Sequence, residues 1–213
     1  MPEAAIRAVL WDFGGVILSS PFDAFARYER ENGLPADFLR RINATNPDTN
    51  AWALLERGDI DLDGFYTLFA EEGRTLGHDV DAKAVLALIE GQVRPKMVAA
   101  LRTVGERYKT ACLTNNIRRA GPSAERSAEI AEIMALFDIV VESSLVGFRK
   151  PDPRFYTHAC QALGVAPEET VFLDDLGINL KPARAMGIRT IKVTDPELAL
   201  DELETHLGHA VRE

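Results

Sequence analysis

Five short, mostly apolar runs divide the sequence and constrain its fold more than any other feature. Runs this short and this apolar are typical of strands that are buried on both faces of a parallel sheet. The intervals between the last four runs are long enough for crossover helices, and residues 155–163 and 181–186 have a clear helical pattern. The sequence therefore predicts an α/β domain with a doubly wound parallel sheet. The runs are residues 8–13, 109–113, 139–141, 170–173 and 190–193.

The interval between the first two runs is much longer and contains no strand-like run, so residues 19–95 are predicted to be helical. Ser20 is predicted to be the N-cap of the first helix, with Pro21 at the first helical position and Gly33 just past the end. Half of the aromatic residues lie in this interval, and we expect them to form the core of a small helical bundle rather than a ligand site. The further helices are predicted near residues 35–44, 49–57, 61–73 and 80–91.

The position of this helical insertion gives it a functional meaning. An insertion directly after the first strand of a parallel sheet lies beside the carboxyl ends of the strands, which is where such sheets bind ligands. We therefore predict a core domain of residues 1–18 and 96–213, and an α-helical cap domain of residues 19–95 that is placed to act as a lid.

The composition argues against several classes of protein. The chain has 213 residues with 24 Lys and Arg against 33 Asp and Glu, and the net charge of −9 argues against nucleic acid or an anionic membrane as a partner. The two cysteines, Cys112 and Cys160, lack metal-site spacing, which argues against zinc, redox dithiols and a disulfide framework. There is neither a signal-peptide pattern nor an apolar run of about 18 residues, so we expect a cytoplasmic protein. The sequence leaves open whether it is a monomer or a homodimer.

Polar residues stand at the predicted ends of the strands and in one later turn, where packing does not require them. Taken singly, most have ordinary explanations, because aspartates cap helices, Thr and Asn start loops, and lysines are usually solvated. The pair Asp174 and Asp175 is harder to explain, since two carboxylates placed near Asp12 repel each other unless a cation holds them ionised. The set consists of Asp12, Phe13, Gly14 and Gly15 after the first strand, Thr114 and Asn115 after the second, Lys150 in a proline-rich turn, and Asp174 and Asp175 after the fourth.

Together these residues are suited to phosphoryl transfer. Mg²⁺ prefers oxygen ligands and keeps several waters, so Asp12, Asp175 and a loop carbonyl such as that of Gly14 would hold it. Asp12 would then attack the phosphorus of a substrate and form an aspartyl phosphate, which splits a difficult hydrolysis into two easier steps. The phosphate oxygens would be held by Lys150, the Thr114 hydroxyl, the Asn115 amide and the loop amides of Phe13, Gly14 and Gly15. Further positive charge beside the site would come from Arg118, Arg119 or Arg149.

In these residues and in their order along the chain, the sequence resembles the haloacid dehalogenase-like superfamily of hydrolases. Residues 146–156 and 171–187 are particularly similar to the N-terminal phosphatase domain of soluble epoxide hydrolases. The resemblance covers essentially the whole chain and implies a Rossmann-like core, a helical cap after the first strand and Mg²⁺ as cofactor. It implies a nucleophile at Asp12, a metal ligand at Asp175, phosphate stabilisation by Thr114 and Lys150, a metal-shell or lysine-orienting carboxylate at Asp174, and a supporting residue at Asn179.

One position departs from the pattern of these phosphatases. They commonly carry a second Asp two residues after the nucleophile, which protonates the leaving oxygen, and this chain has Gly14 there. General acid catalysis typically contributes ~10²–10⁴-fold to the rate. We therefore predict a Mg²⁺-dependent phosphohydrolase of a small phosphorylated metabolite, which hydrolyses glycosyl, acyl and aryl phosphates much faster than simple alkyl monoesters.

Two other functions stay open from the sequence. A 2-haloacid dehalogenase would use Asp12 on a carbon–halogen bond without metal, although the acidic pair favours Mg²⁺. A non-catalytic relative would bind phosphorylated ligands or a partner protein, an alternative that the missing general acid suggests.

The segment from Asp59 to Gly64 begins like an EF-hand calcium loop. In such a loop the twelfth residue is a bidentate Glu, and the twelfth residue here is Ala70. We therefore expect helix-capping aspartates at this place rather than a calcium site.

Overall fold

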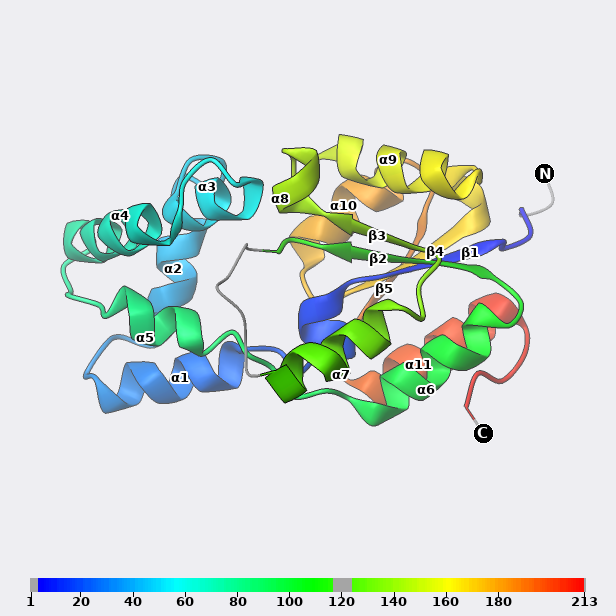
Figure 1. Cartoon of the computed structure of the whole chain (residues 1–213), viewed down its shortest axis with the longest axis horizontal. Coiled ribbons are helices and arrows are strands. Elements are labelled where there is room, and N and C mark those ends of the chain that lie inside the picture. Colours follow the sequence, from blue (N-terminus) through cyan, green and yellow to red (C-terminus); the bar gives the residue numbers. More distant parts are fainter. Residues whose placement is uncertain (1–3, 117–123, 213) are drawn as a thin grey trace.

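The computed structural model describes residues 4–116 and 124–212. Within them, five parallel strands form one sheet in the order β3-β2-β1-β4-β5 (Figure 1), which confirms the predicted doubly wound α/β fold. Every strand lies where an apolar run predicted one, and the ends differ from the prediction by no more than two residues. The strands are β1 (Ala8–Trp11), β2 (Lys109–Thr114), β3 (Ile139–Glu142), β4 (Thr170–Asp174) and β5 (Arg189–Lys192).

The register of the sheet brings the predicted site residues to one edge. Trp11 at the end of β1 pairs with Cys112 of β2 on one side and with Leu173 of β4 on the other. The next residues, Asp12 and Asp174, therefore lie side by side at the carboxyl ends of β1 and β4. The chain also changes direction across the sheet between β1 and β4, which is the usual ligand-binding position in sheets of this kind.

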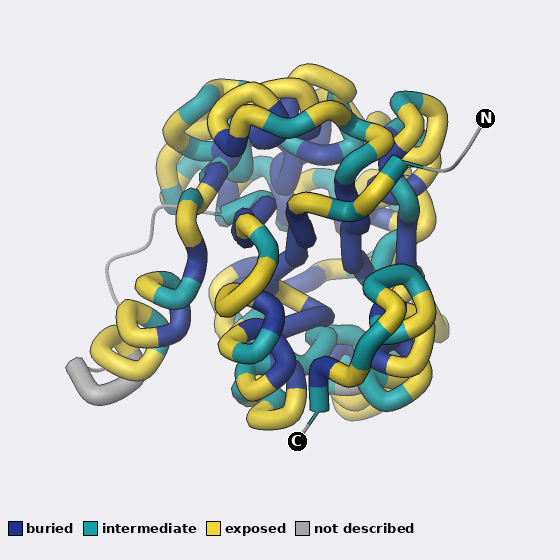
Figure 2. Tube along the Cα trace, turned by 90° about the vertical axis from the view of Figure 1, so that its right-hand side faces the viewer, coloured by how far each residue is buried: buried dark blue, intermediate teal, exposed yellow. Residues whose placement is uncertain are grey.

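Helices cover both faces of the sheet (Figure 1). Side chains alternate along a strand, so Val9 and Trp11 of β1 join the apolar cluster on one face. Ala8 and Leu10 join the cluster on the other face. In Figure 2 buried segments, in dark blue, run through the interior, and exposed segments, in yellow, lie mostly on the outside. On one face lie α8 (Ser143–Val146), α9 (Pro153–Leu163) and α10 (Gly177–Ala185), and on the other α6 (Pro95–Gly105), α7 (Ala124–Met134) and α11 (Pro196–Leu207), while a short 3₁₀ turn, Pro167–Glu169, leads into β4.

The interval between β1 and β2 is helical, as predicted, and its helices lie beside the carboxyl ends of the strands (Figure 1). They enclose a buried cluster of their own, in which Phe65 stacks on Phe69 and lies edge-on to Trp52. The prediction of an aromatic bundle core is thus confirmed, whereas the domain boundaries at residues 18 and 95 stay a prediction. None of the helices described combines the length and the apolar character that a membrane span requires. The helices are α1 (Phe22–Glu31), α2 (Phe38–Ala44), α3 (Ala51–Arg57), α4 (Leu62–Thr75) and α5 (Ala82–Ala87).

The two segments that connect this helical unit to the sheet run side by side. Leu18 and Val93 form an antiparallel bridge, and the Ser19 N–H donates to the Gln92 carbonyl at 2.7 Å. A Cβ atom at Gly91 would lie 2.4 Å from the Ser19 carbonyl oxygen, so only glycine allows this approach. The entry to and the exit from α1–α5 are thus fixed to each other.

The predicted N-cap at Ser20 is wrong. Pro21 occupies the N-cap position of α1, and the helix begins at Phe22 without a side-chain cap. The Ser20 hydroxyl instead donates to Asp175 Oδ2 at 3.2 Å. A contact with the carboxylate that follows β4 has replaced the local contact that the sequence suggested.

Candidate active site

Lys150 is buried between two carboxylates at the carboxyl edge of the sheet. Its Nζ lies 2.8 Å from Asp12 Oδ1 and 2.8 Å from Asp174 Oδ2, and its side chain is only 1% exposed. Burial by itself lowers the pKa of a lysine, but the Asp12 and Asp174 carboxylates outweigh it and raise the pKa of Lys150 above its ordinary value. The lysine is therefore charged, and it fixes the Asp12 carboxylate at the end of β1.

Asp174 is held from its far side as well. The Asn179 side chain donates to both Asp174 oxygens, at 3.1 and 3.0 Å, and the Leu176 N–H donates to Oδ1 at 2.8 Å. These donors come from the turn after β4 and the first turn of α10. Asp174 therefore contacts Lys150 on one side and is held by Asn179 and the Leu176 N–H on the other.

One wide turn, Phe13–Ile17, follows Asp12 directly, and the first N–H of this turn donates to Asp12 Oδ1 at 2.6 Å. Gly15 has φ +77°, and a Cβ atom there would lie 2.2 Å from Asp175 Oδ2. Gly14 has φ −69° and ψ 133°, which any residue adopts, and a Cβ atom there would meet nothing within 4 Å. Gly15 is thus required by the close approach of Asp175, whereas Gly14 is not required by the backbone.

Asp175 lies partly buried opposite this turn. Burial and the neighbouring Asp174 raise the pKa of Asp175 to about 6, although Lys150 and the Ser20 hydroxyl oppose the shift. The raised pKa means that the surroundings of Asp175 favour the neutral carboxyl over the carboxylate. Added positive charge would reverse this preference.

Asp12, Asp174 and Asp175 fit a divalent cation. Each offers a carboxylate oxygen, and these oxygens lie within 4.8 Å of one another. Among the described residues, the three carboxylates outnumber the two cations that act on them, Lys150 and Arg94, so a further cation would complete the charge balance. The donors of the cluster are oxygens, without sulfur or imidazole, and this set suits Mg²⁺ rather than a softer metal.

Thr114 and Asn115 lie at the same edge. Thr114 is the buried last residue of β2, and β2 contacts the turn after Asp12. The Asn115 side chain faces the main chain of Lys150, since its Nδ2 donates to the Lys150 carbonyl at 3.0 Å and its Oδ1 accepts the Lys150 N–H at 2.9 Å. The contact of Asn115 with phosphate stays a prediction, and the structure gives this residue a second task, which is to hold Lys150.

The sequence did not point to Arg94 or Ser20. Arg94 donates from Nη1 to the Gly15 carbonyl at 2.6 Å, and Asp175 opposes the effect of burial, which lowers the pKa of Arg94. Ser20 reaches the same Asp175. An arginine before a helix and a serine before a proline are ordinary residues in a sequence, so no local signal marked either one.

The sequence suggested Arg118, Arg119 or Arg149 as a source of extra positive charge beside the site. Arg118 and Arg119 lie outside the described residues. Arg149 turns toward the helical insertion, where its Nε lies 2.6 Å from Glu56 Oε2.

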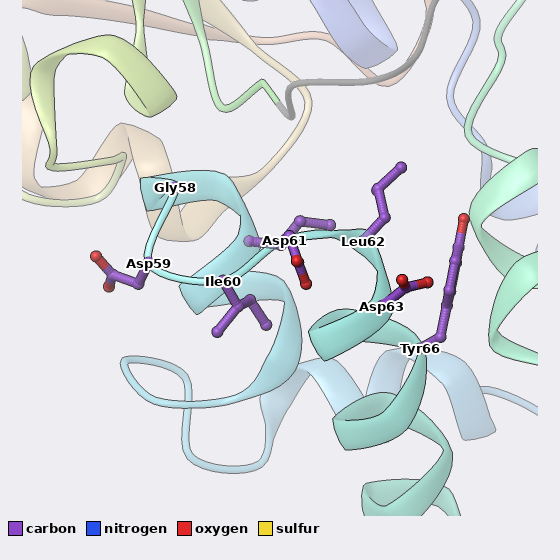
Figure 3. A pocket seen from close by; sticks show the side chains of 8 residues that line it. Gly58, Asp59, Ile60, Asp61, Leu62, Asp63 and Tyr66 are labelled. Carbon is purple, nitrogen blue, oxygen red and sulfur yellow. The ribbon is translucent and has the colours of Figure 1, made fainter.

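A hollow of about 620 Å³ lies beside the connection between α3 and α4 (Figure 3). In Figure 3 the side chains of Leu62 and Tyr66 extend from the first turns of α4 toward the same side. The hollow belongs to the helical insertion that we predict to be a cap. It is lined by Leu55, Gly58, Asp59, Ile60, Asp61, Leu62, Asp63 and Tyr66.

The resemblance of this connection to a calcium loop has a structural explanation. Asp61 is the N-cap of α4, and its Oδ1 accepts the Gly64 N–H at 2.9 Å. Asp59 pairs with Arg57 at 2.8 Å. The prediction of a helix-capping aspartate is confirmed for Asp61.

The chain is similar to proteins of one family. A family model described as haloacid dehalogenase-like hydrolase matches residues 6–187. Bifunctional epoxide hydrolase 2 of the pig, Sus scrofa, is 33% identical over 96% of this chain and 39% of its own length. The sesquiterpene phosphatase of Aspergillus oryzae is 28% identical over 95% of this chain and 97% of its own length.

Solved structures show the same fold. The structure of a HAD family enzyme from Bacteroides thetaiotaomicron in complex with magnesium and inorganic phosphate matches 88% of this chain and 94% of that chain, with a TM-score of 0.59 and 20% identity.

This chain spans less than two fifths of the length of several of its curated relatives.

Proposed function

The chain belongs to the haloacid dehalogenase-like hydrolases, and from that premise we propose that it is a Mg²⁺-dependent phosphohydrolase that cleaves a small organic phosphate through an aspartyl phosphate at Asp12. The observation that carries the proposal is the buried contact of Lys150 with both Asp12 and Asp174. Relatives that are named phosphatases support the proposal. Several curated relatives are much longer than this chain, so the activity that we assign to the whole protein is itself a proposal.

In the first step an oxygen of Asp12 attacks the phosphorus, and the bond to the leaving oxygen breaks with its electron pair on that oxygen. Lys150, 2.8 Å from Asp12, is close enough to bind an oxygen of the phosphoryl group that Asp12 receives. Thr114 and the amides of Gly14 and Gly15 bind further oxygens. Water then attacks the phosphorus, and the bond between phosphorus and the Asp12 oxygen breaks with its electron pair on that oxygen. This restores the carboxylate, and the protons of the water leave on the inorganic phosphate.

The acidic cluster has one role in this scheme. Asp12, Asp174 and Asp175 would hold Mg²⁺, which would supply positive charge to the transferred phosphoryl group. The same charge would keep Asp175 ionised against the burial that raises its pKa. The net charge of the chain is −9, so a phosphate dianion needs this local reversal of sign.

Gly14 sets the preference among leaving groups. The turn after Asp12 presents no carboxyl at that position, so the leaving oxygen departs without a proton from it. Glycosyl, acyl and aryl phosphates need little protonation of the leaving oxygen, and we propose them as the favoured classes of substrate.

The test is a phosphatase assay on a panel of phosphate esters with Mg²⁺, with EDTA, and with the variant Asp12→Asn. We expect turnover that EDTA abolishes and that Asp12→Asn lowers to background. Asp81→Asn is the matched control, because Asp81 is an exposed N-cap of α5 and asparagine caps a helix equally well.

Turnover that resists EDTA, or that survives in Asp12→Asn, would contradict the mechanism. Chloride release from 2-haloacids would identify a dehalogenase instead. Equal rates across a series of leaving groups would refute the role given to Gly14.

A further inference from the structure

The helical insertion contacts the core at a second place besides its linkers, where α3 ends beside α8 (Figure 1). Ser143 Oγ donates to the Glu56 carbonyl at 2.5 Å. Arg149 donates from Nη1 to the Pro47 carbonyl at 3.1 Å, and its Nε lies 2.6 Å from Glu56 Oε2. Glu56 is thus held to the core through its main chain and through its carboxylate.

The Glu56–Arg149 pair is largely removed from water, with side chains that are 16% and 22% exposed. Burial raises the pKa of Glu56, and the charges of Arg149 and Lys150 oppose the rise. Removing one partner of a buried ion pair leaves the other charge without compensation, so such a pair strongly restrains its geometry.

This pair lies next to the catalytic lysine along the chain and in space. Arg149 directly precedes Lys150. Asn115 holds the N–H and the carbonyl of Lys150 from its own side chain. Arg149, which contacts the Glu56 carboxylate, is therefore joined by a peptide bond to a lysine whose main chain is held at the same place.

We propose that Glu56 is a positioning residue for Lys150. With α1–α5 seated on the core, the Glu56 carboxylate holds Arg149. Arg149 directly precedes Lys150, and holding it keeps the Lys150 ammonium aligned on Asp12. The inference deepens the proposed function and rests on it, because it links the seating of the helical insertion to the group that binds the transferred phosphoryl.

The test uses Glu56→Gln, which keeps the size of the side chain and removes its charge. Glu72→Gln is the matched control, since Glu72 is a partly buried carboxylate with a raised pKa that accepts the Ala51 N–H at 2.9 Å inside the helical insertion. The first readout is hydrogen–deuterium exchange at the Lys150 amide. We expect exchange about tenfold faster in Glu56→Gln and unchanged in Glu72→Gln.

Exchange that stays at the wild-type rate in Glu56→Gln would overturn the inference, whether or not the protein turns over a substrate. Absence of turnover in the wild-type protein counts against the proposed function alone, and the exchange readout still decides whether Glu56 holds Lys150.

The second readout is steady-state kinetics with p-nitrophenyl phosphate, whose small leaving group makes few demands on a cap. We expect kcat to fall about tenfold or more in Glu56→Gln with KM changed less than about twofold. A raised KM with unchanged kcat would mean that Glu56 only docks the helical insertion, and it would overturn the positioning role.

Arg149→Met is the reciprocal variant, and it decides the question by the same readouts if Glu56→Gln does not fold. We expect the double variant to be no slower than either single variant, because the two residues act as one unit. Losses that add up in the double variant would contradict the inference.

Discussion

Asp12 Oδ1 lies 2.8 Å from the Lys150 ammonium nitrogen, and the same oxygen accepts the Phe13 N–H at 2.6 Å. Two donors that converge on Oδ1 fix the plane and the orientation of the carboxylate. On the proposed mechanism the attack on phosphorus then falls to Oδ2. The contact therefore orients the nucleophile before any substrate binds.

Replacing Lys150 with methionine tests this contact. Methionine has a similar length and no charge, so Asp12 and Asp174 would be left buried without compensation. Breaking a buried pair in this way costs about 3–5 kcal/mol, which urea unfolding would measure without added metal. Loss of a donor to the phosphoryl group lowers kcat by about 10²–10³-fold.

Lys181→Met is the control for this prediction, because Lys181 is an exposed lysine of α10. It should leave the free energy of unfolding and kcat within experimental error of the wild-type values. A Lys150→Met protein with wild-type stability would contradict the structural role given to the ion pairs.

The sheet was predictable from the sequence because its strands are buried on both faces. Short apolar runs such as residues 170–173 leave few alternatives to a parallel strand, and all five runs form strands. The aromatic core of the helical insertion was predictable from helical spacing. The N-cap of α1 was not, because Ser20 makes a contact with Asp175 that no local pattern contains.

The difference between regular sequence patterns and contacts between distant segments also explains which site residues the sequence revealed. Asp12, Asp174 and Asp175 follow parallel strands, and the carboxyl ends of such strands meet at one edge, so their proximity was predictable. Arg94 lies in the segment that leaves the helical insertion, and the path of that segment brings it to the Gly15 carbonyl. Glu56 meets Arg149 where the insertion contacts the core. Contacts of this kind depend on how the insertion is seated, which periodicity does not determine.

Gly14→Asp should add the general acid that the turn lacks. The backbone at this position has φ −69° and ψ 133°, and a Cβ atom has open space, so an aspartate fits without strain. We expect hydrolysis of alkyl monoesters to rise about 10²-fold relative to aryl phosphates, at the lower end of the ~10²–10⁴-fold range of general acid catalysis. The measurement is kcat/KM for both classes of substrate.

Gly14→Asn is the matched control, because asparagine has nearly the same size and no acidic proton. It should leave the ratio of alkyl to aryl rates unchanged. If Gly14→Asn raises the alkyl rate as much as Gly14→Asp does, the gain does not come from proton donation.

Gly15→Ala should have the opposite outcome to a change at Gly14. Gly15 has φ +77°, and a Cβ atom there would lie 2.2 Å from Asp175 Oδ2. Asp175 must then move, so we expect activity to fall about 10²-fold or more. The stabilisation of the protein by Mg²⁺, measured as a shift in Tm, should be lost with it. Gly14→Ala is the control, and it should retain that shift.

Stabilisation by Mg²⁺ should depend on pH through Asp175, whose pKa is raised to about 6 by burial and by Asp174. In the metal-free protein the contribution of this carboxyl to stability is present below its unfolded pKa and is lost as pH rises through about 6, because the folded chain binds the proton more tightly. Mg²⁺ requires the ionised form, so its apparent Kd should be about tenfold weaker at about pH 5 than at about pH 7.5, and its Tm shift correspondingly smaller. Thermal unfolding with and without Mg²⁺ at both pH values measures this. Asp175→Asn should abolish the shift at either pH, and a Tm shift of equal size at both pH values would contradict the titration of Asp175.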